Sequence, residues 1–415
     1  MSNLWDLLID PLLRGPTWGT ILVCGALAAV GVLAYVRRTT QVGELISHAA
    51  YPGVVVGLLL TGSPAGAIAG AALSALIALG CMGRLTRRGL SPDNALALVL
   101  ALFFGAGLLL ASRAQFLDPR LFRQVQTYLY GQAPSMTDQH ILLYAALALT
   151  VLLAIAICFK ELQLWSFDPT QARLNGLGSR PLELMFIGLL TLSVLASLKA
   201  VGIVLATAML VAPAVAARQF NNRLDRMLLW GALIGMVSGW LGLYCSLYGL
   251  PAGPMVALIS VAIALASLLV APRNGLLVRL GRMARFRRQC IDENILKAIW
   301  RAGDGMTTLA QLHNCVGGRL LSLRWALLRL RRHGWLTARI GLTLDGAQRA
   351  AVIVRRHRLW EAYLVTSLGV GIERVHPSAE EMEHILTPEV EAQLVQLLRD
   401  PRHDPHNQPI PQVPR

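Results

Sequence analysis

Long apolar segments dominate the first two thirds of the chain. About nine of them approach the length, roughly 20 residues, that an α-helix needs to cross the hydrocarbon core of a bilayer. They lie near residues 17–36, 44–61, 64–83, 93–112, 140–159, 182–198, 200–217, 227–249 and 252–271. Gly and Pro occur inside several segments, and transmembrane helices tolerate both because neighbouring helices satisfy the freed backbone groups. The pattern predicts an all-α polytopic bundle of about nine transmembrane helices.

The composition changes after these segments. The chain has 415 residues, 55% hydrophobic and 15% charged, with a mean hydropathy of +0.54, which excludes a soluble globular domain and a disordered chain. Residues 1–284 contain 19 Lys/Arg and 10 Asp/Glu, whereas residues 285–415 contain 19 and 13. The six cysteines form no CxxC motif and are expected as apolar side chains in helices. We therefore expect one domain in lipid, followed by another in water.

Positive charge gathers in alternate connections of the predicted bundle. Arg and Lys are frequent after the first, third, fifth, seventh and ninth segments, whereas the connections at 61–64 and 248–254 carry no charge. Cytoplasmic loops of membrane proteins carry such an excess, so the amino terminus is expected outside and the last third in the cytoplasm. The connection at 113–139 contains three Arg and two Asp and is placed outside by parity alone.

An acidic residue and a histidine stand one helical turn apart in the second segment. Glu44 and His48 are four residues apart, so they share one face of a helix. An ionisable pair in a membrane span is costly unless it faces protein or a cavity, which favours a functional site. Carboxylate and imidazole suit manganese, iron or zinc, but two ligands require others from elsewhere or from a second subunit. The alternative is a salt bridge at the helix end, with Glu44 reaching the interface.

A short segment between two predicted spans has the signals of a capped helix. In SFDPTQARLNGLG, at 166–178, Asp168 can cap a helix that begins at Pro169, and Gly176 can end it. Such a helix on the cytoplasmic side offers a compact knob, although ordinary caps would also shape a plain connector. The chain contains no GxxxxGK[ST] motif, so ATP hydrolysis would have to come from a separate chain.

Several of these stretches resemble the permease subunits of metal-ion ABC importers, of the zinc, manganese and iron type. The similarity extends over residues 1 to about 272 and includes GELISHAAYPGVVVGLLL, SPD at 91–93, YLYG at 128–131, FDP at 167–169 and AVG at 200–202. It implies that Glu44 and His48 are metal ligands of the transport pathway, although the family more often has aspartate at the position of Glu44. It also implies a coupling helix that docks into the ATPase subunit, formed by Asp168, Pro169, Ala172 and Gly176.

The stretch after the last span begins with a basic linker at 273–289, for which anionic lipid headgroups are the economical partner. An apolar-periodic run at 291–300, a short helix at 308–313, a longer helix at 319–333 and a hairpin at 335–344 then follow. This order predicts a winged helix-turn-helix over 290–346. The recognition helix would present Arg319, Arg324, Arg329, Arg331 and Arg332. Winged helices also serve as protein-interaction modules, and the fold alone does not establish DNA binding.

Histidines concentrate in the last third of the chain, which contains seven of the nine. His357 and Glu361 are at i and i+4, and His376 begins another helix. Glu380, Glu383 and His384 follow His376 on one stripe. Three imidazoles and three carboxylates are enough donors for one or two divalent ions. A single His-Glu pair would more often be a surface contact.

The stretches RRHRLWEAYL, VHPSAEEMEHIL and DPHNQPIP resemble the metal-dependent repressors of the diphtheria-toxin-repressor family over about 290–412. The similarity implies a helical metal-binding and dimerisation domain at 347–415. It implies that His357, Glu361 and His376 are ligands of one site, and that Glu380, Glu383 and His384 are ligands of the other. Two positions depart from the family: Asn294 stands at the first-helix ligand position, and Lys297 stands where manganese-type members have a carboxylate. The carboxylate of Glu380 favours manganese.

Taken together, the sequence predicts the permease subunit of an ABC importer for manganese, zinc or ferrous iron in a prokaryotic plasma membrane. The permease would form a homodimer, bind no nucleotide itself, and work with an ATPase subunit and an extracytoplasmic metal-binding protein. The cytoplasmic module would be a metal-responsive brake, with nucleic acid an unlikely partner. The alternatives are a membrane-tethered metal-dependent transcription regulator and an ion-gradient-driven metal carrier.

Overall fold

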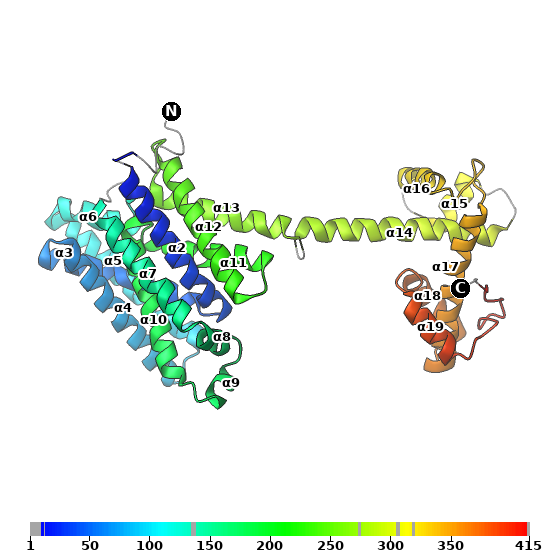
Figure 1. The fold of residues 1–415 in the computed structure, drawn as a ribbon, viewed down its shortest axis with the longest axis horizontal. Coiled ribbons are helices and arrows are strands. Elements are labelled where there is room, and N and C mark those ends of the chain that lie inside the picture. Colours follow the sequence, from blue (N-terminus) through cyan, green and yellow to red (C-terminus); the bar gives the residue numbers. More distant parts are fainter. Residues whose placement is uncertain are drawn as a thin grey trace. The chain divides into compact units, whose positions relative to one another are not determined.

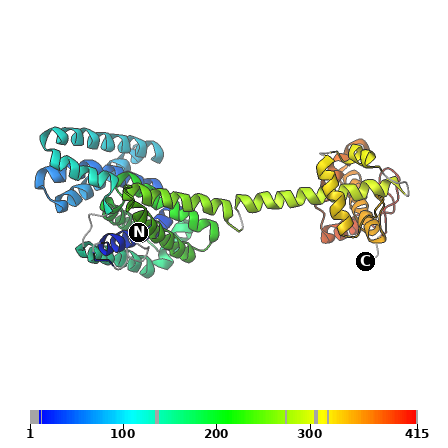
Figure 2. The same cartoon turned by 90° about the horizontal axis from the view of Figure 1, so that it is seen from above.

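The computed structural model describes residues 10–11, 13–133, 138–272, 275–303, 308–317 and 320–412. The chain divides into two compact units, Met1–Val278 and Arg279–Arg415. Helices account for most of the described residues, and the first unit is drawn in blue to green and the second in yellow to red (Figures 1 and 2). Arg273 and Arg319, which the sequence placed in the basic linker and the recognition helix, lie outside the described residues.

The first unit is a bundle of long apolar helices. Its elements are α2 (Arg14–Val36), α3 (Thr40–Thr61), α4 (Pro64–Arg87), α5 (Pro92–Leu117), α6 (Pro119–Tyr130), α7 (Asp138–Ile157), α8 (Phe159–Phe167), α9 (Pro169–Leu174), α10 (Ser179–Ala200), α11 (Ile203–Phe220), α12 (Leu224–Ser246) and α13 (Ala252–Val270). Among the described residues, eight helices are long and apolar enough to cross a membrane, and α7 and α8 together make a ninth, bent by 70°. The prediction of about nine spans is confirmed.

Helix α3 lies inside this bundle and packs on α4, α5, α10 and α11. Its contact with α4 depends on glycines spaced four residues apart. A Cβ atom at Gly53 would overlap the carbonyl oxygen of Gly70, and one at Gly57 would overlap that of Gly66. Small residues at this spacing let two membrane helices approach backbone to backbone. The position of α3, which carries Glu44 and His48, therefore depends on glycines, because they have no side chain to keep the backbone of α4 away.

The connection at 113–139, expected as a loop, contains the helix α6. Asp118 caps it by accepting a hydrogen bond from the backbone nitrogen of Arg120 at 2.8 Å, and Pro119 is its first residue. Its apolar face buries Val125, Tyr128 and Leu129 in the bundle core. The helix is amphipathic rather than uniformly apolar, so a search for apolar segments of spanning length passes over it.

The second unit contains α14 (Leu276–Ala302), α15 (Leu309–Val316), α16 (Leu320–Arg332), α17 (Leu344–Leu368), α18 (Val375–Met382) and α19 (Pro388–Leu397). Helix α14 begins in the stretch expected as a linker and continues unbroken to residue 302, with its first three residues in the first unit. The predicted hairpin is reduced to a single antiparallel bridge between Leu336 and Leu342, and the described residues contain no extended strand.

Two arginines expected on the recognition helix have structural partners within the second unit. Arg329 forms a bidentate ion pair with Asp292 of α14, at 2.6 and 2.7 Å. Arg331 donates a hydrogen bond to the carbonyl oxygen of Ala338 at 2.8 Å. A bidentate pair fixes guanidinium geometry, so Arg329 serves the packing of α16 on α14.

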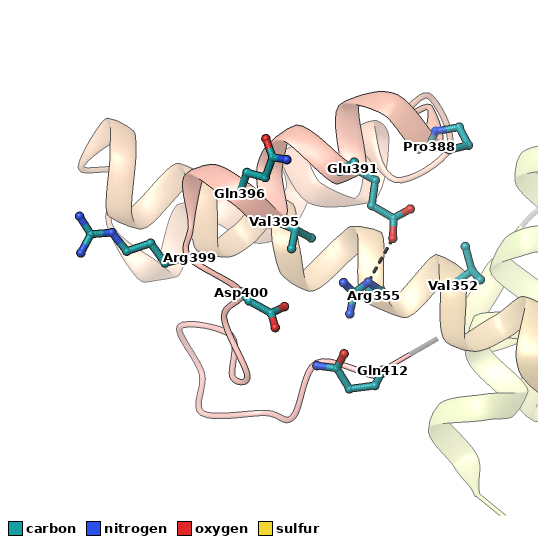
Figure 3. Close-up of a pocket in the computed structure, with 10 residues that line it drawn as sticks. Val352, Arg355, Pro388, Glu391, Val395, Gln396, Arg399, Asp400 and Gln412 are labelled. Atoms are coloured by element: carbon teal, nitrogen blue, oxygen red, sulfur yellow. Dashed lines mark hydrogen bonds and ion pairs between the residues drawn. The ribbon is translucent and has the colours of Figure 1, made fainter. Parts of the chain in front are cut away.

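Ion pairs also fasten the elements around α17. Arg355 and Arg356 share the carboxylate of Glu391 on α19, at 3.1 and 3.0 Å, and Figure 3 shows the pair between Arg355 and Glu391. The closing segment DPHNQPIP folds back to α17, where Arg358 lies 3.5 Å from Asp404. These contacts hold α19 and the tail against α17, the helix that carries His357 and Glu361.

We expect Gly53→Ala to destabilise the membrane unit, because the added methyl group meets the backbone of α4 rather than a movable side chain. Such overpacking costs about 1–3 kcal/mol. Thermal unfolding of the protein in detergent should therefore begin at a lower temperature. Gly80→Ala on α4 is the control, because nothing lies within 4 Å of a Cβ atom there. Equal unfolding temperatures for the two variants would contradict this account of α3.

Candidate metal sites

Glu44 and His48 are both half-buried on the first turns of α3. The Nδ1 atom of His48 is buried without a hydrogen-bond partner, and its ring meets the ring of Phe104 on α5 edge to face, with centroids 4.8 Å apart. No hydrogen bond or ion pair joins Glu44 to His48 or to another described residue. A buried imidazole nitrogen without a partner is unusual and has a lone pair or a proton to share.

A third polar group near this pair is the backbone carbonyl of His48, and a proline affects it. Pro52 lies four residues after His48 inside α3, and a proline has no N–H to donate to the carbonyl of His48. Ser74 of α4 donates a hydrogen bond to the next carbonyl, that of Ala49, at 2.6 Å. The carbonyl oxygen of His48 therefore lacks its usual helical donor. The Nδ1 atom of the same residue also has no hydrogen-bond partner. Sequence reasoning treated Pro52 only as a tolerated interruption, although its spacing from His48 contained this signal.

The predicted coupling segment is a capped helix with one buried residue. Asp168 accepts hydrogen bonds from the backbone nitrogens of Thr170 and Gln171, at 3.1 and 2.9 Å, and Pro169 is the first residue of α9. Ala172 is 1% exposed, whereas the other residues of α9 are exposed. Gly176 adopts a φ of +75°, which turns the chain after the helix. Asp168, Pro169, Ala172 and Gly176 thus build a single exposed knob.

This knob is tied to the bundle through the preceding helix, α8. The guanidinium of Arg37, at the end of α2, lies 3.1 Å from the centroid of the Trp165 ring and donates a hydrogen bond to the carbonyl of Trp165 at 3.1 Å. Trp165 is itself buried against Phe186 of α10. A cation–π contact with a buried tryptophan is among the stronger of its kind. A movement of α8 and α9 would therefore also displace α2 and α10.

In the second unit, His357, Glu361 and His376 form one compact set of donors. His357 and Glu361 lie one turn apart on α17, and His376 lies at the start of α18. The Oε1 atom of Glu361 is 3.2 Å from Nε2 of His357 and 2.9 Å from Nδ1 of His376, and the two imidazole nitrogens are 3.1 Å apart. Ligands at metal bond lengths of about 2.1 Å lie roughly 3 Å or more from one another, so the three atoms fit a divalent ion. This set is the only such group of three among the described residues.

The other predicted ligands do not form a second open set. Glu383 is fully buried, and its Oε2 atom accepts a hydrogen bond from Nδ1 of His357 at 2.5 Å. Its Oε1 atom lies 2.5 Å from the ammonium of Lys297 on α14. His384 points Nδ1 at Glu293 of α14, at 2.7 Å. Glu380 is half-exposed and lies 3.8 Å from Lys297.

These contacts shift the pKa values of the central groups. Burial opposes the charge on His357, but hydrogen bonds and attraction from Glu361 and Glu383 outweigh it and raise the pKa of His357 above its ordinary value. Burial likewise opposes the charge on Glu361, yet its bonds to His357 and His376 lower its pKa from 4.5 to about 2. His357 and Lys297 lower the pKa of Glu383 against its burial. The cluster is a network of opposed charges that favours ionised carboxylates.

Sequence reasoning missed two partners of this network. Glu293 is buried and accepts hydrogen bonds from His384 and Gln289, yet in the sequence it is one acidic residue in a mixed helix. Lys297 was recognised only as a departure from a ligand position. Its bond to Glu383 joins residues 86 positions apart, and only the packing of α14 reveals it.

The first unit is a helical membrane bundle with a glutamate and a histidine that share no hydrogen bond. The second unit contains a set of side chains that could bind a metal ion. Together these features indicate a membrane protein that binds metal ions. Residues 10–271 match the model of the ABC 3 transport family, and the chain belongs to that family. Residues 343–412 match the iron dependent repressor, metal binding and dimerisation domain. The protein is therefore a multi-pass permease of a metal ABC transporter, in which a separate subunit hydrolyses ATP.

Three known proteins illustrate the similarity. The chain is 32% identical over 439 residues to a probable metal transport system membrane protein of Chlamydia trachomatis, which covers 95% of both chains. It is 32% identical to the manganese transport system membrane protein MntC of Bacillus subtilis, over 72% of this chain and 70% of that one. The solved structure of PsaBC from Streptococcus pneumoniae in complex with Fab superposes with a TM-score of 0.60 at 26% identity, covering 67% of this chain and 98% of that chain.

We expect the metal-free second unit to be best protected between about pH 4.5 and 6.5, the ordinary pKa values of Glu361 and His357. The lowered pKa of Glu361 gives stability that is present above about pH 4.5 and lost as the pH falls towards 2. The raised pKa of His357 gives stability that is present below 6.5 and lost as the pH rises through that raised value. Hydrogen exchange of peptides from α17, corrected for intrinsic rates, measures both limits.

The control for the alkaline limit is His357→Gln. It should abolish the loss of protection at high pH and keep the acidic limit, because Glu361 retains His376 as its partner. A wild-type alkaline limit that persists in this variant would show that another group is responsible.

Proposed function

We propose that this protein is the permease subunit of a manganese importer and that its carboxy-terminal unit reduces uptake when cytosolic metal is sufficient. The observation that carries the proposal is the pairing of two donor sets in one chain, Glu44 with His48 and His357 with Glu361 and His376. The family and the similarity of residues 343–412 to a metal-binding repressor domain support it. The carboxylate of Glu380 and the manganese relative favour manganese over zinc and ferrous iron.

In the membrane, Glu44 and His48 would pass a divalent substrate across the bundle. Both are half-buried on α3, neither forms a hydrogen bond or an ion pair with a described side chain, and the carbonyl of His48 adds an oxygen ligand. Weak, incomplete coordination suits a site that must release its cargo. A second copy of the chain would complete the pathway, and an extracytoplasmic binding protein would deliver the metal.

The exposed α9 would dock into the ATPase subunit from the cytoplasmic side. Asp168 and Pro169 fix the helix start, and buried Ala172 seats it on the bundle. The contact of Arg37 with Trp165 links α8 to α2, so closure of the ATPase would be transmitted to the helices around α3. Small displacements at such a contact can shift a bundle between two packed arrangements.

In the second unit, His357, Glu361 and His376 would bind the regulatory ion between α17 and α18. A bound divalent ion supplies positive charge that draws the three donors together. Glu383 holds Nδ1 of His357 and so fixes the ring with Nε2 towards Glu361. Filling this site would stabilise one arrangement of the unit and thereby reduce transport.

We expect Glu44→Gln and His48→Ala to lower manganese uptake by more than about tenfold, because each removes a charged or basic donor from the pathway. Uptake of radioactive manganese into proteoliposomes that contain the whole transporter measures the effect. Glu44→Asp is the matched control, since it keeps the carboxylate, and it should retain uptake. Full uptake by Glu44→Gln would exclude this residue from the pathway.

We expect His357→Ala with His376→Ala to abolish inhibition by internal manganese while leaving the initial uptake rate intact. These two changes leave the membrane unit unaltered and remove two of the three donors of the regulatory site. Uptake into proteoliposomes preloaded with increasing manganese measures the inhibition. Unchanged inhibition in the double variant would refute the regulatory role.

A further inference from the structure

A lysine ammonium lies beside two of the three ligands of the second predicted metal site. Lys297 is 5% exposed, and its Nζ atom lies 2.5 Å from Oε1 of Glu383 and 3.8 Å from Oε1 of Glu380. The Nε2 atom of His384 lies 3.6 Å from the same oxygen of Glu383. Two of the three predicted ligands, Glu380 and Glu383, thus face a cation of the chain, and His384 lies near the same oxygen of Glu383. A buried ammonium persists only where carboxylates compensate it.

The charged side chains around the two donor sets leave a net negative charge that one divalent ion would balance. Glu293, Glu361, Glu380 and Glu383 contribute four negative charges. Lys297 contributes one positive charge, and Arg349, 4.0 Å from Glu293, contributes another. The remaining two negative charges equal the charge of a single divalent ion, whereas two such ions would leave a net excess of positive charge beside the buried groups Glu361, Glu383 and Lys297.

Lys297 also acts on the first site through one carboxylate. The two oxygens of Glu383 are divided between Lys297 and Nδ1 of His357. A carboxylate that accepts a hydrogen bond from Nδ1–H keeps the proton on Nδ1, leaves the Nε2 lone pair free to bind a metal, and fixes the orientation of the ring. Nε2 is the nitrogen that faces Glu361 and His376. The ammonium therefore anchors the carboxylate that orients the imidazole ligand.

We propose that Lys297 is a built-in cation that replaces the second metal ion, so that the unit binds one divalent ion, and that it positions Glu383 to orient His357. Lys297 is a positioning residue and does not touch the bound ion. The inference rests on the proposed regulatory site for the ion bound by His357, Glu361 and His376. Its own claim concerns Lys297 and Glu383, and the positioning of Glu383 by Lys297 can be tested without metal.

The test compares Lys297→Met and Lys297→Glu with the wild type in the full-length protein. Hydrogen exchange of peptides covering 375–384 is measured in EDTA and in manganese, and bound manganese is counted by elemental analysis. A background of Glu44→Gln and His48→Ala removes ions held by the membrane unit. Arg329→Met is the control, because it removes another ion pair of α14, with Asp292, and leaves Glu383 untouched.

The wild type should be protected in EDTA and bind one manganese ion. Lys297→Met should exchange about a hundredfold faster in EDTA, because Glu383 loses its buried counter-charge, and manganese should not restore full protection. Lys297→Glu should also lose protection in EDTA, but it should bind one additional manganese ion and recover. Arg329→Met should keep the wild-type metal count.

Four results distinguish the inference about Lys297 from the proposed regulatory site. Two ions in the wild-type unit, or wild-type protection of 375–384 in Lys297→Met, would overturn the inference about Lys297. No additional ion in Lys297→Glu would overturn it too, and would leave the regulatory site standing if the wild type binds one ion. If the wild type binds none and Lys297→Met still loses protection in EDTA, the regulatory site fails and the structural role of Lys297 is supported.

Discussion

A charged side chain that is taken out of water must meet an opposite charge or a ligand, and both candidate sites depend on this constraint. The two units satisfy it in different ways. On α3 the Nδ1 atom of His48 has no hydrogen-bond partner within the described chain, which is what the proposed passage of an ion would require. In the second unit, Glu383 has a partner on each oxygen. A pathway requires weak, incomplete contacts, whereas a sensor requires a rigid set of donors.

The packing of α3 shows how the membrane unit meets the same constraint for its backbone. Close contact of Gly53 and Gly57 with α4 seats one face of α3 against protein rather than against lipid. Ser74 of α4 satisfies the carbonyl of Ala49, while Pro52 leaves that of His48 without its usual donor. The glycines thus seat α3 against α4, and the proline removes the usual helical donor from the carbonyl of the residue that carries the imidazole.

The sequence predicts the long spans well, because lipid demands about 20 apolar residues whatever their neighbours are. It predicts α9 too, since Asp168 and Pro169 are local capping signals. It does not predict α6, which has one apolar face, or the bend between α7 and α8. Local spacing places His357 beside Glu361, but the roles of Glu293 and Lys297 depend on how α14 packs against residues almost 90 positions away. Side-chain chemistry is visible in a sequence, whereas distant pairing is not.

A covalently attached cation and a metal ion are not equivalent in a regulator. The ammonium of Lys297 is present at every metal concentration, so the order that it gives to Glu383 does not depend on the ligand. If the set formed by His357, Glu361 and His376 binds a single regulatory ion, as proposed, the response of the unit would follow the occupancy of that ion. A two-ion cluster would give a steeper response and would leave its donors mutually repelled when empty. With Lys297 in place, Glu383 keeps a buried counter-charge when no metal is bound, and a graded response would suit the regulatory role proposed for this unit.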